Sequence, residues 1–165
     1  MGISEALLPE LDREMTIVRK VLERAPDGRF SWRPHARSFS LGELVSHIAH
    51  LPTWGAETLN MGEIDIGTSP RPAELGSTAA VIATFDANVA AMRAALVGMS
   101  DDQIMTIWTL KRNGKVLFSM PKAVVLRSFV LSHVIHHRGQ LSVYLRLLDV
   151  PVPSMYGPSA DEPAF

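Results

Sequence analysis

Four stretches of the chain carry hydrophobic residues at steps of three and four, with polar residues between them. This period places the apolar side chains on one face of a helix, so each stretch is predicted to be amphipathic. The first runs from about Ser4 to Glu23 and the second starts at Ser40. The third spans about Ser77 to Val97, and the fourth follows Ser119 and ends near Leu148.

Local signals mark the boundaries of these helices. Ser40 and Glu43 have the spacing of a capping box, which begins a helix. Pro52 falls inside the second pattern, where we expect a kink or a break. Residues 62–76 are rich in Gly, Pro, Ser and Thr and are predicted to form a long loop. Asn113-Gly114, between two short β-prone runs, predicts a small hairpin.

Four long helices with little strand indicate an all-α fold of the helical-bundle class, with the β-hairpin between helices three and four. The connections are not all short, so topologies other than up-down-up-down are open. A chain of 165 residues corresponds to one domain, which we assign to residues 1–165.

Composition narrows the function classes. Lys and Arg number 16 and Asp and Glu 17, so the net charge of −1 disfavours a dedicated nucleic-acid binder. There is no cysteine, which excludes disulfides, thiolate metal sites and a cysteine nucleophile. The N-terminus lacks the pattern of a signal peptide, and no apolar run approaches the length of a membrane span. We therefore expect a cytoplasmic protein without membrane or nucleic-acid partners.

The six histidines carry the candidate chemistry. His133 and His137 are four residues apart, so both imidazoles project from one helical face and can share a divalent ion. Val134 follows the first histidine, where zincins have their glutamate, so this class is excluded. The alternative is that both are core histidines with ordinary hydrogen-bond partners.

His47 shares an apolar face with Leu44 and Leu51 on the second helix and is the candidate third ligand. His50 takes its place if the helix phase differs. His136 is rotated away from the His133–His137 pair, so it is expected nearby or at the surface. Arg138 and Gln140 are expected to orient ligands or substrate, with a solvated arginine as the alternative. We expect His35 in a surface loop, and Asp161 and Glu162 as tail charges.

Three segments together resemble the DinB/YfiT-like superfamily: Trp32-Arg33-Pro34, residues 40–50 (SLGELVSHIAH) and residues 133–140 (HVIHHRGQ). The tail from Val152 to Glu162 is also similar, so the resemblance spans nearly the whole chain. It implies a four-helix bundle of up-down-down-up topology, often dimeric. It also implies a divalent metal, zinc or nickel, held by three histidines that map to His47, His133 and His137.

The resemblance further implies the chemistry. Relatives include thiol-dependent transferases and a mycothiol-dependent maleylpyruvate isomerase, so the leading hypothesis is a metal-dependent enzyme with a low-molecular-weight thiol as co-substrate and a small-molecule substrate. The alternatives are a metal-dependent hydrolase and a non-enzymatic, metal-containing stress-response or binding protein. The sequence identifies no catalytic acid or base. A basic hairpin turn at Lys111–Lys115 leaves DNA binding as a third reading.

Overall fold

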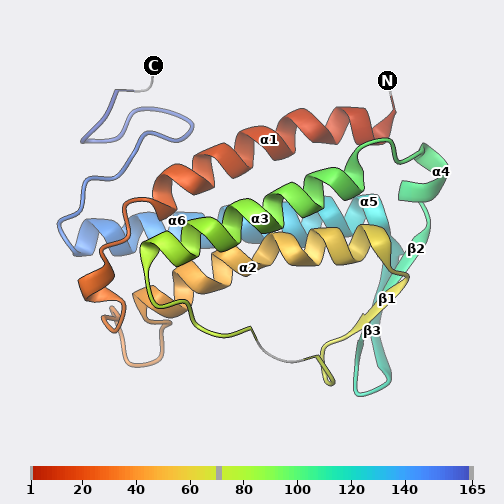
Figure 1. Ribbon diagram of the computed structural model, residues 1–165, viewed down its shortest axis with the longest axis horizontal. Coiled ribbons are helices and arrows are strands. Elements are labelled where there is room, and N and C mark those ends of the chain that lie inside the picture. The colour runs from red at the N-terminus through yellow and green to blue at the C-terminus, as the bar shows by residue number, and fades with distance from the viewer. Residues whose placement is uncertain (1, 70–71, 164–165) are drawn as a thin grey trace.

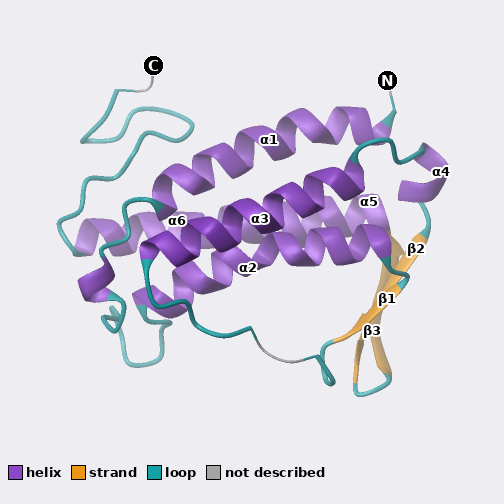
Figure 2. Ribbon diagram, viewed as in Figure 1, coloured by secondary structure: helices purple, strands orange, loops and turns teal. Residues whose placement is uncertain are grey.

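The computed structural model describes residues 2–69 and 72–163. The chain is mostly helical and carries one small three-stranded sheet at one end (Figures 1 and 2). The elements are α1 (Ile3–Leu22), η1 (Asp27–Arg29), α2 (Leu41–Asn60), β1 (Glu63–Asp65), α3 (Thr78–Leu96), α4 (Asp101–Ile104), β2 (Ile107–Arg112), β3 (Lys115–Pro121), α5 (Lys122–Val125), η2 (Leu126–Leu131) and α6 (Ser132–Leu147).

The long helices lie side by side. In Figure 1, α1 runs from right to left, α2 and α3 both run from left to right, and the α5–η2–α6 segment returns from right to left. Since α2 and α3 run in the same direction, the chain between them must travel back along the length of the molecule. That connection includes β1 at the sheet end (Figure 2).

Helix α2 carries one of the candidate ligands, and local signals fix its start. The Ser40 side chain accepts from the Glu43 amide at 3.0 Å, while the Glu43 carboxylate accepts from the Ser40 amide at 2.6 Å. The predicted capping box is therefore confirmed. A break at Pro52 was the wrong expectation, because α2 continues to Asn60. Pro52 is buried in the packed helix, and this packing offsets the one hydrogen bond that proline removes.

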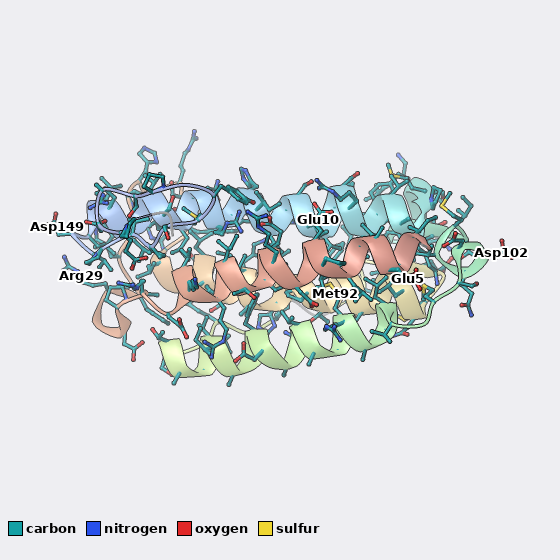
Figure 3. All side chains as sticks on the ribbon, turned by 90° about the horizontal axis from the view of Figure 1, so that it is seen from above. Glu5, Glu10, Arg29, Met92, Asp102 and Asp149 are labelled. Atoms are coloured by element: carbon teal, nitrogen blue, oxygen red, sulfur yellow. The ribbon has the colours of Figure 1, made fainter. Side chains whose placement is uncertain are left out.

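Helices α2 and α3 pack closely at Gly55. A Cβ at that position would lie 2.1 Å from the Met92 sulfur, so only glycine leaves room for the methionine. Met92 is fully buried, and Figure 3 shows it among the side chains between the helices. Four apolar residues of α3, at steps of four and seven, are buried: Val81, Phe85, Met92 and Leu96.

By length and composition alone, α3 is apolar enough to cross a membrane, which corrects the expectation that no segment approaches this limit. It is the single such helix in the described part of the chain. Its buried stripe packs into the hydrophobic core that also holds residues of α1, α2 and α6. Apolar composition is thus explained in part by core packing.

The predicted hairpin forms from β2 and β3. Asn113 and Gly114 have φ values of 51° and 77°, the left-handed angles that a two-residue hairpin turn requires. The region predicted to be one long loop also contains β1, which pairs in parallel with β2. Asp65 ties the two together, since its carboxylate accepts from the amides of Asn113 and Gly114 at 2.8 and 2.7 Å.

The fourth predicted helix differs from expectation at its start. Strand β3 extends to Pro121, so the helix begins at Lys122. Within it, η2 is a π-helix of six residues that leads directly into α6. A π-helical turn is rare and is often found at functional sites. Here it ends at Leu131, two residues before His133.

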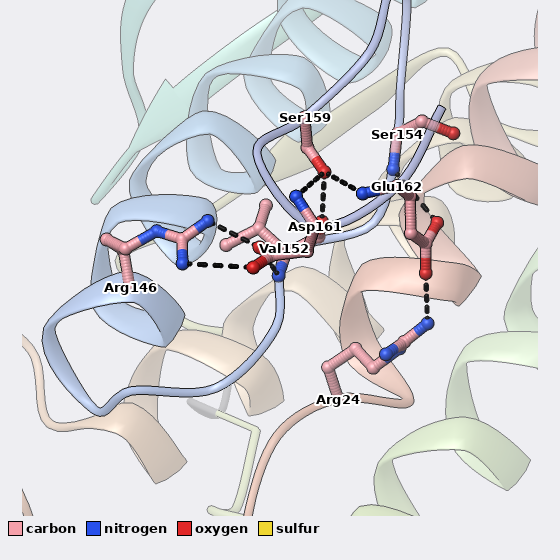
Figure 4. A network of polar contacts seen from close by, with 7 residues as sticks. All are labelled: Arg24, Arg146, Val152, Ser154, Ser159, Asp161 and Glu162. Carbon is pink, nitrogen blue, oxygen red and sulfur yellow. Dashed lines mark hydrogen bonds and ion pairs between the residues drawn. The ribbon is translucent and has the colours of Figure 1, made fainter. Parts of the chain in front are cut away.

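The C-terminal segment is bound to the helices, which corrects the expectation that Asp161 and Glu162 are tail charges. Asp161 pairs with Arg146 of α6 and accepts from the Val152 amide at 2.8 Å. Glu162 pairs with Arg24, just after α1. Figure 4 shows that these contacts fold the tail back on itself and attach it to both helices.

Candidate metal centre

Three imidazoles from two helices converge between α2 and α6. His47 projects from α2, and His133 and His137 project from α6. One ring nitrogen of each lies within 4.8 Å of the others. The Nε2 atoms of His47 and His133 are 3.4 Å apart. We refer to these three residues as the histidine cluster.

The helical period explains the convergence. His133 and His137 are one turn apart, and their ring centroids are 4.7 Å apart. His47 faces both of them, at centroid distances of 5.2 and 4.6 Å. Among the candidates on α2, the structure thus brings His47 to the pair.

Burial keeps two histidines of the cluster, His133 and His137, neutral. It lowers the pKa of His133 from 6.5 to about 4, and the nearby His137 and His136 act in the same direction. Burial also lowers the pKa of His137, with the nearby His136 adding to the effect and the hydrogen bond that His137 donates to Gln140 opposing it. Both rings are therefore uncharged at neutral pH, which is the form that binds metal.

Gln140 sets the orientation of His137. The Gln140 side-chain oxygen lies 2.7 Å from Nδ1 of His137. An amide oxygen accepts, so Nδ1 carries the proton and the lone pair remains on Nε2. Contacts of this kind typically fix the tautomer of a metal-binding histidine. Gln140 is expected from the sequence to orient ligands or substrate, and in the structure its contact is with His137.

The other candidate rings do not join the cluster. His136 is exposed, and its ring centroid lies 4.9 Å from that of His137. Phe39, which is 45% exposed, packs 5.8 Å from His47 and 6.4 Å from His137. His50 is half-buried, and its Nε2 has no hydrogen-bond partner among the described residues. His35 lies in an exposed loop and accepts from the Arg37 amide.

Arg138 has a structural role in place of the expected one. Its guanidinium is 2% exposed and pairs with Glu14 of α1 at 2.7 Å. It also donates to the Tyr156 hydroxyl and lies over the Tyr156 ring, 4.8 Å from the centroid. The Tyr156 hydroxyl donates to Glu14 at 2.7 Å, which closes the network. This network, which is buried at Arg138 and Glu14 and exposed at Tyr156, joins α1, α6 and the C-terminal segment one residue after His137.

A signal for this network was present in the sequence. Glu14 lies three residues after Leu11 and four before Val18, on the apolar stripe of the first helix. A carboxylate at a core position requires a charged or hydrogen-bonding partner. Its burial at 6% exposure agrees with that requirement.

The cluster fits a divalent transition metal. Zinc binds histidine at about 2.0–2.1 Å, and tetrahedral geometry then places two ligand nitrogens roughly 3.4 Å apart. The His47–His133 nitrogen distance of 3.4 Å equals this value. Three imidazoles also suit the nitrogen-binding first-row metals. The cluster can therefore hold one ion and leave further coordination positions open.

Changing Gln140 is expected to weaken metal binding. Gln140→Leu removes the acceptor that holds His137, and affinity should fall by about 10- to 100-fold. Gln140→Glu retains an acceptor and serves as the matched control. Competition with a chromophoric chelator measures both constants. Equal affinities for the two variants would show that the contact does not orient the ligand.

Acid is expected to destabilise the metal-free protein. As pH falls below 6.5, the unfolded chain protonates His133 before the folded chain does, because the folded pKa is about 4. The unfolded state then binds more protons, so the free energy of unfolding decreases between about pH 6.5 and 4. Urea denaturation at several pH values across this range gives the free energy of unfolding as a function of pH. This free energy should depend less steeply on pH in His133→Asn than in the unmodified protein. The exposed His35→Asn is the control, and an equal slope in all three proteins would contradict the assignment.

The fold and the histidine cluster define a mostly helical protein with a small sheet and a candidate metal site. The chain belongs to the DinB family, whose model matches residues 3–164. Two crystal structures of DinB-like proteins are similar to it. One, from Bacillus cereus, has a TM-score of 0.71 and 22% identity, covering 92% of this chain and 97% of its own.

The second, from Bacillus subtilis, has a TM-score of 0.71 and 19% identity, covering 90% of this chain and 96% of its own. At these identities the similarity establishes the fold. No curated protein matches the sequence.

Proposed function

We propose that this chain holds one divalent ion through His47, His133 and His137 and transfers a low-molecular-weight thiol to a small electrophilic substrate. The observation that carries the proposal is the convergence of three imidazole nitrogens within 4.8 Å. Three protein ligands with open positions are typical of catalytic metal sites, whereas structural sites are closed by four. Zinc and nickel are the proposed metals.

The chain's own residues prepare the site. Burial keeps His133 and His137 neutral, so their lone pairs are available at neutral pH. Gln140 holds the Nδ1 proton of His137 and directs Nε2 toward the cluster. A divalent ion bound there supplies Lewis acidity, which lowers the pKa of a bound water or thiol.

The sulfur of this reaction must come from a co-substrate. The sequence has no cysteine, so no protein thiol is available as nucleophile. The resemblance to thiol-dependent transferases supports an external low-molecular-weight thiol. The same resemblance supports a homodimer and a four-helix bundle of up-down-down-up topology, and the helix directions in Figure 1 agree with that topology. We place the protein in the cytoplasm, without nucleic-acid partners, as its near-neutral charge suggests.

The test uses purified untagged protein loaded with Zn²⁺ or Ni²⁺. Consumption of 1-chloro-2,4-dinitrobenzene is followed with cysteine, glutathione or mycothiol as the thiol. We expect turnover that requires both metal and thiol and that is lost in His137→Ala. Metal-dependent hydrolysis of an ester substrate in the absence of thiol would favour a hydrolase. Stoichiometric metal without turnover of either substrate would favour a non-enzymatic metal protein.

A further inference from the structure

A surface hollow of about 380 Å³ opens beside the histidine cluster. It is lined by Ser128, Phe129, Ser132, His133 and His136. His133 belongs to both the cluster and the hollow, so a molecule in the hollow lies next to one residue of the candidate metal site. No charged side chain lines it among the described residues.

Phe129 forms the apolar wall of this hollow. It lies in η2, and it lines the hollow together with His133. Its side chain is 38% exposed, whereas Leu126, Val130 and Leu131 of the same segment are buried. The π-helical turn changes the angular positions of residues 126–131, and π-helical turns recur where a helix presents functional side chains.

The Phe129 ring is held in place from one side. Phe118 of β3 packs against it with a centroid distance of 4.6 Å and an interplanar angle of 36°. Phe118 in turn lies 6.1 Å from Trp108, which is fully buried. An aromatic ring that is fixed by a buried cluster and still partly exposed loses little conformational entropy when a ligand stacks on it.

The polar groups of the hollow indicate what else a ligand carries. The Ser132 hydroxyl is already engaged, since it donates to the Arg127 carbonyl at 3.1 Å. The Ser128 hydroxyl has no hydrogen-bond partner in the described part of the chain. A ligand for this hollow therefore combines a planar apolar group with a neutral hydrogen-bonding group.

We propose that Phe129 is a stacking platform that selects substrates bearing an aromatic or similarly planar group, placed so that their reactive atom lies at the histidine cluster. This inference rests on the proposed function, because it takes the cluster as the reactive centre. It assigns Phe129 a role in substrate specificity and leaves the metal ligands unchanged.

Two hydroxamates test the platform by equilibrium binding. Benzohydroxamate and acetohydroxamate bind zinc through the same oxygen atoms and differ in the aromatic ring. Titration calorimetry on the Zn²⁺-loaded protein should show that benzohydroxamate binds about fivefold to tenfold more tightly. In Phe129→Ala this ratio should fall to within about twofold, with acetohydroxamate affinity retained. Phe129→Leu keeps an apolar contact with Phe118 and tests the loss of aromaticity alone.

Phe39→Ala is the matched control, since Phe39 is a similarly exposed aromatic ring near the cluster that does not line the hollow. It should retain the preference for the aromatic hydroxamate. The proposal would be overturned if the ratio of the two hydroxamate affinities were unchanged in Phe129→Ala. It would also be overturned if the preference for benzohydroxamate disappeared in Phe39→Ala instead. Zinc-containing protein without any preference overturns the platform alone, whereas protein that retains no zinc overturns the proposed function as well.

Discussion

Alanine at His47, His133 or His137 is expected to reduce bound metal from about one ion per chain to less than about 0.1. Each variant removes one of three ligands, and the two remaining imidazoles form a much weaker site. Burial of the cluster adds to the effect, because solvent replaces a lost ligand less readily inside the protein than at the surface. Metal content by plasma mass spectrometry, after dialysis of untagged protein, measures the result.

His50→Ala and His35→Ala are the matched controls for this experiment. His50 is the alternative ligand that helix phase alone left open, and it lies one turn from His47. Both control variants should retain the ion. Loss of metal in His50→Ala with retention in His47→Ala would reverse the assignment on α2.

The second large effect is expected on stability. Glu14→Gln leaves the Arg138 charge buried without its carboxylate partner, and the free energy of unfolding should fall by about 3–5 kcal/mol. Urea denaturation measures this change. Asp12→Asn is the control, because its pair with Arg93 is exposed and should contribute less than about 1 kcal/mol.

A double variant distinguishes the effect of removing the ion pair from the effect of leaving one buried charge without its partner. Glu14→Leu combined with Arg138→Met removes both charges, so it should be less destabilising than Glu14→Gln alone. If Glu14→Gln destabilises no more than Asp12→Asn does, the network does not hold α1 against α6.

Patterns among neighbouring residues predict much of the fold. The long helices, the start of α2 at Ser40 and the hairpin turn at Asn113-Gly114 depend on neighbouring residues, so the sequence alone predicts them. The spacing of His133 and His137 likewise depends only on the helical period. The apolar face of the second helix made His47 the candidate third ligand, the family resemblance implied the same residue, and the structure places His47 in contact with the pair.

The features that sequence reasoning missed depend on distant partners. Strand β1 forms because it pairs with β2, more than 40 residues away in the chain. Arg138 is buried because Glu14, 124 residues earlier, neutralises it. Asp161 and Glu162 are fixed by Arg146 and Arg24, contacts that no local pattern reveals. The helical period alone left His50 as an alternative to His47 for the metal ligand on α2, because the identity of that ligand depends on how α2 packs against α6.

The central claim is that the histidine cluster binds a single divalent ion. Crystals of protein loaded with Zn²⁺, with data collected on both sides of the zinc absorption edge, test it most directly. We expect one anomalous peak at about 2.0–2.1 Å from a ring nitrogen of each of His47, His133 and His137. A peak at other residues, or no peak in the loaded crystals, would contradict the claim.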